Sequence, residues 1–367
     1  MNKSSITSAN NDHYESVVLV SNFVYHYRVP VYNHLNQRLM KNGQKLVVAT
    51  NMLQENSPHT VEFELVEGLT QLSAYKSVIA KNMPATVILF LHIKDFFVWP
   101  LMYWMKRRQI KFIYWNHGVN LQTPNSVFKN FIYGIFHSAA DALLLYSENE
   151  KKFIARRHWS KLFVANNTIN FSSFPEITQS SDQLRVKWKI PFDKVVLFVG
   201  RIEDEKRLDD LLAAAPKLAD NTGVVVVGGG LSEEQRQTID ASDKLIYLGE
   251  IYDAVDINQI YKLADVFSIP GKVGLGLNHA FYWGLPVVTE DVLHSPEIVY
   301  LRAGENGYIV PEGDVDSLAR RLNELVGSDE VYRQFSDAAK REIQTNSHID
   351  VMCDGFLAAL NYCATSH

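Results

Sequence analysis

The sequence predicts an α/β protein with two doubly wound, Rossmann-like parallel-sheet domains. Short apolar runs alternate with helix-length segments along the chain, and this pattern restarts near residue 190. Apolar strands separated by helices are typical of parallel sheets that are covered on both faces. The length of 367 residues also suits two domains of ordinary size.

Ten apolar runs, most of them rich in β-branched or aromatic residues, are the expected strands. In the first half they are residues 16–21, 45–50, 86–91, 111–116 and 141–146. In the second half they are residues 194–200, 223–228, 244–249, 265–270 and 285–289. The polar stretch 177–183 (ITQSSDQ) is the expected linker, which places one domain at residues 1–178 and the other at 179–348. Ligands of doubly wound sheets bind beyond the carboxyl ends of the strands, so we expect the site in a cleft between the two domains.

Composition excludes several classes of protein. Hydrophobic residues make up 47% and charged residues 21%, close to the average of a soluble globular protein. The two cysteines, Cys353 and Cys363, have no partners at metal spacing, so neither a disulfide framework nor a zinc site is expected, and a reducing cytoplasm is favoured. Residues 1–14 lack the pattern of a secretory signal, and the longest apolar stretch, 128–146, contains Lys129, His137 and Asp141. We therefore expect no membrane-spanning helix.

Charge is distributed unevenly. Residues 1–180 contain 18 Lys and Arg against 11 Asp and Glu, a balance of +7, and the remainder has 18 against 30, a balance of −12. The basic clusters lie at 106–111 and 151–161, and the first follows the aromatic stretch 96–108 (FFVWPLMYWMKRR). Two interpretations stay open: a solvated basic face over a packed helix, or peripheral contact with an anionic membrane surface. Nucleic acid is not an expected partner, because the chain is acidic overall and lacks a reader motif.

The segment 195–212 (VVLFVGRIEDEKRLDDLL) carries the first motif with chemical meaning. A buried strand ends at Gly200, and Arg201 and Lys206 follow in a polar loop before a helix. Two cations at the carboxyl end of a strand, beside a helix N-terminus, suit a diphosphate. Surface ion pairs with the adjacent carboxylates of residues 203–205 are the alternative.

This motif resembles the donor-phosphate motif of the GT-B glycosyltransferases, and family 4 in particular. In that family the Arg and the Lys contact the diphosphate of a nucleotide sugar and stabilise the leaving nucleotide. The resemblance implies the same roles for Arg201 and Lys206. A Gly usually follows the Lys, whereas this chain has Arg207.

A second segment, 268–290 (SIPGKVGLGLNHAFYWGLPVVTE), resembles the family pattern that ends in Gly-x-Pro-Val-Val. Its Gly-rich loop before a helix can expose backbone N–H groups to a phosphate, although such loops are often only tight turns. The family has two Glu residues here, one that contacts the donor sugar and one that holds the ribose; they align with Gly271 and His279. The donor-binding residues that the resemblance implies are Gly200, Arg201, Lys206, Gly271, Lys272, Val273, Gly274, Leu275, Gly276, Asn278 and His279.

The first half supplies the expected acceptor site. Asn116, His117 and Gly118 follow a buried strand, and family 4 enzymes often have a His near this place. His117 is the third expected catalytic residue, beside Arg201 and Lys206, although a turn histidine is the alternative. His26 and Arg28 follow the first strand, in a stretch that resembles the opening of many bacterial polysaccharide glycosyltransferases. The expected acceptor-binding residues are therefore His26, Arg28, Asn116 and His117.

The resemblance implies a retaining, metal-independent transfer from a UDP- or GDP-sugar to a glycan or lipid-linked acceptor, in bacterial surface polysaccharide or lipopolysaccharide synthesis. It also implies a cytoplasmic protein, with peripheral contact at the inner face of the membrane left open, and a C-terminal helix (349–367) that crosses back onto the first domain. No cofactor and no metal ligand set are expected. Two alternatives remain: a non-catalytic glycan-binding or scaffold subunit with the same fold, favoured by Gly271, and a sugar-nucleotide epimerase.

Overall fold

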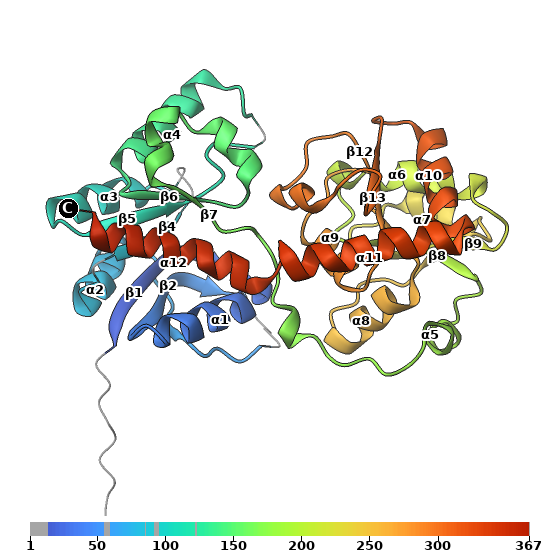
Figure 1. The fold of residues 1–367 in the computed structure, drawn as a ribbon, viewed down its shortest axis with the longest axis horizontal. Helices are drawn as coiled ribbons and strands as arrows, with labels where there is room; N and C mark the ends of the chain where they lie inside the picture. Colours follow the sequence, from blue (N-terminus) through green and yellow to red (C-terminus); the bar gives the residue numbers. More distant parts are fainter. Residues whose placement is uncertain (1–13, 55–58, 85, 92–94, 122, 367) are drawn as a thin grey trace, which may run out of the picture. The chain divides into compact units, whose positions relative to one another are not determined.

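The computed structural model describes residues 14–54, 59–84, 86–91, 95–121 and 123–366 (Figure 1). The chain divides into two compact units. The first contains Met1–Leu144, Phe153–Phe163 and Gly355–His367, and the second contains Leu145–Lys152 and Val164–Asp354. Residues 164–178 thus group with the second unit, where Phe171 and Ile177 lie in the hydrophobic core.

In its described residues, the first unit holds a seven-stranded sheet in the order β3-β2-β1-β4-β5-β6-β7. The strands are β1 (Glu15–Val24), β2 (Gln44–Leu53), β3 (Glu64–Val66), β4 (Thr86–Phe90), β5 (Lys111–Trp115), β6 (Ala142–Leu145) and β7 (Leu162–Val164). Pairing is parallel from β3 through to β6, and Val18 of β1 lies opposite Val47 of β2. The α-helices are α1 (Val29–Met40), α2 (Leu72–Asn82), α3 (Val98–Arg107) and α4 (Val127–Ala139).

The second unit, all of whose residues are described, has a six-stranded parallel sheet in the order β10-β9-β8-β11-β12-β13. The strands are β8 (Lys194–Val199), β9 (Thr222–Val227), β10 (Leu245–Tyr247), β11 (Val266–Ser268), β12 (Val287–Glu290) and β13 (Gly307–Val310). The helices are α5 (Ser181–Lys187), α6 (Leu208–Ala214), α7 (Glu233–Asp240), α8 (Ala254–Leu263), α9 (Leu275–Tyr282), α10 (Val315–Gly327) and α11 (Asp329–Thr345). The strand order reverses between β8 and β11, so their carboxyl ends form the expected ligand crevice of this sheet.

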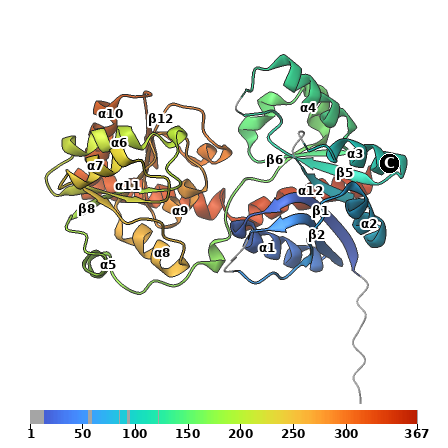
Figure 2. The same ribbon diagram turned by 180° about the vertical axis from the view of Figure 1, so that it is seen from behind.

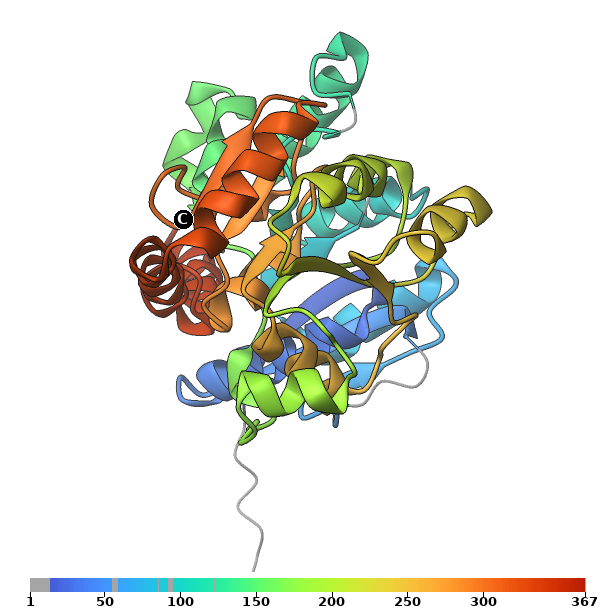
Figure 3. The same cartoon turned by 90° about the vertical axis from the view of Figure 1, so that its right-hand side faces the viewer.

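Helices cover both faces of the second sheet. Helices α5 and α8 lie on one side of the strands and α6, α7 and α10 on the other, in the front view and in the view from behind (Figures 1 and 2). A view at a right angle shows the same two layers (Figure 3). Because both faces are covered, the strands are mostly apolar, and every residue of β9 is buried.

The predicted fold class is confirmed. Each of the ten apolar runs contains a strand, but β3, β7 and β13 were not predicted. These strands are three or four residues long and each lies at a sheet edge, and β3 and β7 are only half-buried. Such short strands hold fewer apolar residues in a row than the runs on which the prediction depended.

The last helix, α12 (Ile349–Thr365), follows α11, and its residues from Gly355 onward group with the first unit. Phe356 packs edge-on against Trp115 of β5, with ring centroids 4.8 Å apart. Lys111 Nζ donates to the Cys363 carbonyl at 2.7 Å, and both cysteines are buried thiols. These contacts attach the end of the chain to β5.

Candidate functional site

Glycines bring two strand ends of the second sheet into contact. Gly228, directly after β9, lies so close to the Gly200 carbonyl that a Cβ on it would stand 1.8 Å from that oxygen. The Ile202 amide donates to the Gly229 carbonyl at 2.7 Å, and Gly230 packs on the Ile202 carbonyl. The sequence analysis missed this role of Gly228–Gly230, although three consecutive glycines after a buried strand were a visible signal.

The two cations of the predicted phosphate motif have different surroundings. The Arg201 side chain is 83% exposed and forms an ion pair with Glu203 at 3.0 Å. Lys206 is half-buried, and its Nζ donates to the Lys272 carbonyl at 2.6 Å. Burial lowers the pKa of Lys206, and the neighbouring Glu205 carboxylate opposes that effect. Arg201 is therefore accessible from solvent, whereas Lys206 is held against the glycine-rich loop.

That loop, residues 271–276, is hydrogen-bonded along its start to the turn that carries Lys206. The Gly271 amide donates to the Lys206 carbonyl at 3.0 Å, and the Lys272 amide donates to the Glu205 carbonyl at 2.7 Å. A Cβ on Gly271 would stand 2.1 Å from the Glu205 carbonyl oxygen. The space for a side chain at 271 is thus filled by backbone, and a Glu could not be added there without moving the turn.

Lys272 stands beside this contact and is partnered by Glu205, with Nζ and the carboxylate 3.2 Å apart. Val273 is fully buried, and its amide donates to His294 Nδ1 at 3.2 Å. The other ring nitrogen of His294 donates to the Glu290 carbonyl at 2.8 Å, so the ring is neutral, and burial lowers its pKa accordingly. His294 fixes the middle of the loop, a role that the sequence analysis missed.

The loop ends where α9 begins, with Gly274 as N-cap. Gly276, in the first turn, lies against the Phe267 ring of β11, where a Cβ would stand 3.1 Å from the ring. The helix therefore starts close to the strand ends, and the first-turn amides of Leu275 and Gly276 have no acceptor within the helix. Backbone donors at this place favour an anionic ligand.

The structure does not bring the Asn278 and His279 side chains to the loop. Asn278 is fully buried, and its Nδ2 donates to Ser347 Oγ at 2.6 Å. His279 stacks on Tyr261 with ring centroids 3.8 Å apart, and its Nε2 lies 2.9 Å from Asn258 Oδ1. Burial lowers the pKa of His279 to about 3, so the ring is neutral. Both contact sets are those of structural residues, and the predicted donor-binding roles of these two side chains gain no support from them.

A buried ion pair supports the turn of residues 200–206, which carries the predicted phosphate motif and is called the phosphate turn below. This pair was not predicted from the sequence. Glu290, at the end of β12, is fully buried and lies 2.8 Å from Arg207 Nε. The Gly313 amide also donates to this carboxylate at 3.0 Å. Burial raises the pKa of Glu290, and the Gly313 amide and Arg207 oppose that rise. Arg207 further contacts Asp210 at 2.8 Å and Glu312 at 2.9 Å.

Arg207 also explains why a Gly is usual after the Lys in the family motif. Its φ of +53° lies in the left-handed region, which glycine adopts without steric cost. In this chain the strain of an Arg there is offset by its carboxylate partners, so the departure from the motif keeps the same backbone path.

In the first unit, the predicted acceptor residues lie at the carboxyl ends of β1 and β5. Arg28 is buried in the 3₁₀ turn His26–Arg28, and its guanidinium stands 5.1 Å from the centre of the Trp115 ring. Asn116 is buried, and its Oδ1 accepts from the Gly118 amide while its Nδ2 donates to the Tyr114 carbonyl. Asn116 thus shapes the turn that presents the half-buried His117. Burial lowers the pKa of His26.

Helix α4 exposes an apolar stripe. Four of its large side chains are exposed, at spacings that place them on one side of the helix; they are Val127, Phe128, Phe131 and Ile135. Trp99 of α3 packs against Phe136 of α4, with ring centroids 4.4 Å apart. Helix α3 buries Val98, Leu101 and Met105 and ends in the exposed basic residues 106–108. The stretch 96–108 is thus partly a core helix, and the exposed apolar surface also includes Phe96 and Tyr103.

The described residues include neither a helix able to span a membrane nor a metal-binding cluster. None of their helices combines the length and the apolar character that crossing a bilayer requires. Nor do they contain a cluster of three or more His, Cys, Asp or Glu side chains suited to a metal ion.

A protein-family model matches most of the second unit. Residues 180–342 match the family model "Glycosyl transferases group 1", which is the segment that contains the phosphate turn, the glycine-rich loop and Glu290. These residues form a group 1 glycosyltransferase domain. The expected resemblance is thereby confirmed for this unit.

Named relatives agree with this assignment. An uncharacterized glycosyltransferase of Haemophilus influenzae is 24% identical over 63% of this chain and 64% of its own length. The phosphatidyl-myo-inositol mannosyltransferase of Mycobacterium leprae is 26% identical over 57% of this chain and 58% of its own length. The alignments thus span less than two thirds of these relatives.

Solved structures match the fold of nearly the whole chain, beyond the group 1 domain. The sucrose-phosphate synthase of Thermosynechococcus elongatus superposes with a TM-score of 0.71 at 18% identity, covering 96% of this chain and all of that one. Anabaena HepE in complex with UDP and glucose gives 0.73 at 13% identity, covering 95% of this chain and all of that one. At these identities the likeness shows the fold, which is the GT-B fold.

Replacing Arg207 by Gly should destabilise the group 1 domain. Glycine removes the strain of the left-handed backbone at this position, which stabilises the domain by about 1 kcal/mol. The change also leaves the buried Glu290 without its cation, which destabilises the domain by about 3–4 kcal/mol. We expect a net loss of about 2–3 kcal/mol in urea denaturation. Arg207→Gly combined with Glu290→Gln should recover most of the loss, and Arg201→Ala, at an exposed site, should change little. Equal stability of Arg207→Gly and the unaltered protein would contradict the role of the pair.

Acid should destabilise the domain through His279. Its pKa is near 6.5 when unfolded and about 3 when folded, so the unfolded state takes up a proton first as the pH falls. Stability should therefore decline below about pH 6.5. His279→Phe, which keeps a ring on Tyr261, should flatten that decline when thermal midpoints are measured between pH 7.5 and 4.5. An unchanged slope would show that His279 takes no part in it.

Proposed function

We propose that this protein is a retaining glycosyltransferase of the family 4 type. It transfers a sugar from a nucleotide-sugar donor to a glycan or lipid-linked acceptor in bacterial surface polysaccharide synthesis. One observation carries the proposal: the Gly200–Lys206 turn and the 271–276 loop are joined by backbone hydrogen bonds at the carboxyl ends of β8 and β11. This joins cations and free helix amides into one anion-binding surface.

The donor diphosphate binds over this surface. Arg201 and Lys206 face the developing negative charge on the leaving nucleoside diphosphate, and the first-turn amides of α9 add hydrogen-bond donors. Lys206 Nζ, whose partner in the structure is the Lys272 carbonyl, transfers that hydrogen bond to a phosphate oxygen when the donor arrives. Because fixed cations supply the countercharge, the reaction needs no metal ion.

The chemical step is a front-side displacement. The acceptor hydroxyl attacks the anomeric carbon from the side of the departing phosphate, and a phosphate oxygen takes the hydroxyl proton as the bond to the nucleotide breaks. Configuration at the anomeric carbon is retained. The protein contributes position and charge stabilisation rather than a strong general base.

The donor sugar is held without the carboxylate that the family has at position 271. Since backbone fills that space, the remaining polar groups of the loop are the Lys272 ammonium and the loop amides. The donor is a UDP- or GDP-sugar. HepE is described with UDP and glucose and with UDP-glucose, so a UDP-sugar is the first donor to test.

The acceptor binds to the first unit, near His117 and Arg28 and the turn that Asn116 shapes. His117 contacts the acceptor hydroxyl and Arg28 an anionic group, with His26 at the same strand edge. The α4 stripe (Val127, Phe128, Phe131 and Ile135) and the basic residues 106–108 suit peripheral contact with an anionic bilayer at the inner face of the membrane. Such contact would bring the enzyme to a lipid-linked acceptor.

Nucleotide release from UDP-, GDP-, ADP- and dTDP-sugars, with and without lipid-linked acceptors, tests the activity. We expect release from one donor that depends on acceptor and persists in EDTA. Arg201→Ala and Lys206→Ala should each lower kcat/KM by roughly 100-fold, as expected for loss of one group that stabilises transition-state charge. The matched control Lys217→Ala removes a solvent-facing cation paired with Asp316 and should leave the rate unchanged.

Other outcomes would favour the alternatives. Donor interconversion without any acceptor would indicate an epimerase. Silence across the whole panel, together with no nucleotide binding, would indicate a non-catalytic subunit.

Vesicle co-sedimentation tests the membrane surface. Full-length protein should pellet with vesicles that contain anionic lipid and stay in solution with neutral ones at physiological salt. Phe128→Ser with Phe131→Ser should lower the pelleted fraction at least severalfold, because two side chains that would enter the bilayer are removed. The control Val186→Ser changes an apolar side chain that is equally exposed in the second unit. Equal losses in both variants would rule out α4 as the contact.

A further inference from the structure

A cavity lies in the second unit, away from the phosphate turn. It has a volume of about 950 Å³, within the range of small-molecule sites. Its walls come from the 3₁₀ turn Phe171–Ser173, from α5 and α11, and from the ends of α8 and α9. No part of the predicted donor or acceptor site contributes to it.

This cavity opens at the other end of the sheet. Asp265, in its wall, directly precedes β11, and its Oδ2 accepts from the Val195 amide at the start of β8 at 2.8 Å. The donor loops follow the carboxyl ends of these same strands. A six-residue strand is about 20 Å long, so one small ligand cannot occupy both places.

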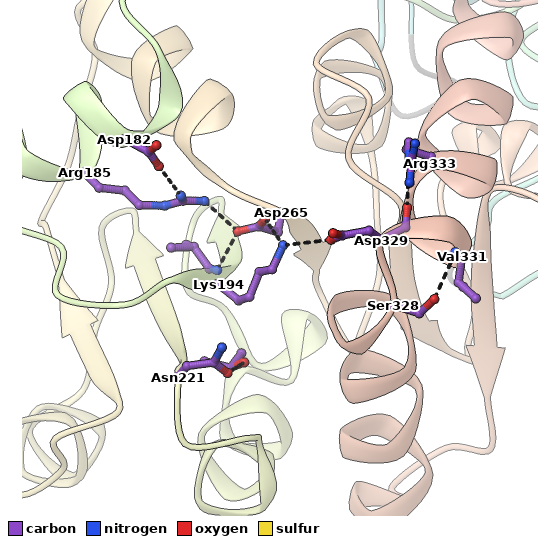
Figure 4. Close-up of polar contacts among 11 residues, drawn as sticks. Asp182, Arg185, Lys194, Asn221, Asp265, Ser328, Asp329, Val331 and Arg333 are labelled. Atoms are coloured by element: carbon purple, nitrogen blue, oxygen red, sulfur yellow. Dashed lines mark hydrogen bonds and ion pairs between the residues drawn. The ribbon is translucent and has the colours of Figure 1, made fainter.

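The carboxylate in the cavity wall, Asp265, already has cationic partners. Asp265 accepts from Arg185 at 2.9 Å and lies 3.4 Å from Lys194, while Arg185 also holds Asp182 at 3.0 Å (Figure 4). Lys194 reaches on toward Asp329 of α11 at 3.9 Å (Figure 4). This network leaves the cavity with unbalanced positive charge from two other residues in its wall, Lys262 and Lys340.

Lys340 is the cation best placed for a ligand. It is exposed on α11, and within the described chain it forms no hydrogen bond or ion pair. Its stem lies over Gly284, where a Cβ would stand 2.4 Å from Lys340 Cε. Lys262, in contrast, donates to the Ile177 carbonyl at 2.6 Å. A free ammonium positioned in this way favours an anionic group.

The rest of the cavity wall includes aromatic rings and a side-chain amide. Tyr282, Trp283 and Tyr332 are each partly exposed in the cavity, and the Gln344 amide, also without a partner in the described chain, can donate and accept. Aromatic faces and an amide suit a ring that carries hydroxyl groups. Tyr332 also receives the Lys194 ammonium at 5.8 Å from its ring centre, which fixes the ring in place.

We propose that this cavity is a second binding site, for an acidic saccharide whose carboxylate or phosphate pairs with Lys340. The sugar ring lies against Trp283 and Tyr332, and the Gln344 amide bonds its hydroxyl groups. The charged group can belong to a free sugar phosphate or to a uronate within a glycan. The site does not depend on the transferase activity proposed above.

Calorimetric titration of the full-length protein tests the site with four probes: glucose 6-phosphate, a disaccharide that contains glucuronate, glucose and inorganic phosphate. At least one of the two sugar acids should bind at least tenfold more tightly than glucose or phosphate, because only they engage both the ring wall and the cation. Which of them binds identifies the source of the anionic group. Lys340→Gln should weaken this binding roughly tenfold, the usual effect of losing one charged hydrogen bond.

Two control variants make the result decisive. Arg341→Gln removes the same charge from the adjacent position of α11, outside the cavity wall, and should change binding less than twofold. Lys206→Ala, in the donor turn, should also leave it unchanged. Absence of binding by both sugar acids overturns the proposal, as does equal affinity in Lys340→Gln and the unaltered protein. Equal loss in Arg341→Gln, or loss in Lys206→Ala, overturns it too, because binding would then reflect general charge or the donor loops.

Discussion

The predicted donor site of the second unit depends on a backbone contact between two loops, made by two hydrogen bonds. The amides of Gly271 and Lys272 donate to the carbonyls of Lys206 and Glu205, so two loops from neighbouring strands behave as one surface. The contact requires glycine at 271, since a Cβ there would overlap the Glu205 carbonyl. The missing family carboxylate and the close loop contact are therefore one feature: the backbone approach excludes the side chain.

The same turn is supported from the other direction by Arg207 and the buried Glu290. Because Arg207 has a left-handed backbone, its side chain leaves the turn toward the end of β12 and meets Glu290 and Asp210. Glu290 in turn holds the Gly313 amide, and its carbonyl holds His294, whose ring fixes Val273. Thus a chain of polar contacts leads from the phosphate turn through β12 back to the glycine-rich loop. Glu290 and Val273 are buried, and Arg207 and His294 are half-buried, so removing Arg207 would leave a buried carboxylate without its cation.

The sequence predicted the parts of this structure that depend on local pattern. Buried parallel strands are mostly apolar, so the ten runs located most strands of the two sheets. The strand-ending motifs placed Gly200, Arg201, Lys206 and the 271–276 loop at the ends of β8 and β11, where their donor-binding roles stay predictions. It could not predict which loops touch, because the hydrogen bond from the Lys272 amide to the Glu205 carbonyl joins residues 67 positions apart. It also could not tell which way a helical side chain points. His279 occupies a motif position, yet its ring stacks on Tyr261, and only the packing of α8 against α9 decides that.

The two strands at the centre of the second sheet are fixed at both ends, by different physical means. At the amino end, the Asp265 carboxylate binds the Val195 amide, Arg185 and Lys194, which sets β8 beside β11 through charge and hydrogen bonds (Figure 4). At the carboxyl end, glycines allow backbone to meet backbone, and side chains are excluded. Since β8 and β11 carry the two loops predicted to bind the donor, their relative position sets the distance between the Lys206 turn and Gly271. A change in the charge network at Asp265 would therefore act on these loops through two short strands, without touching any residue of the predicted donor site.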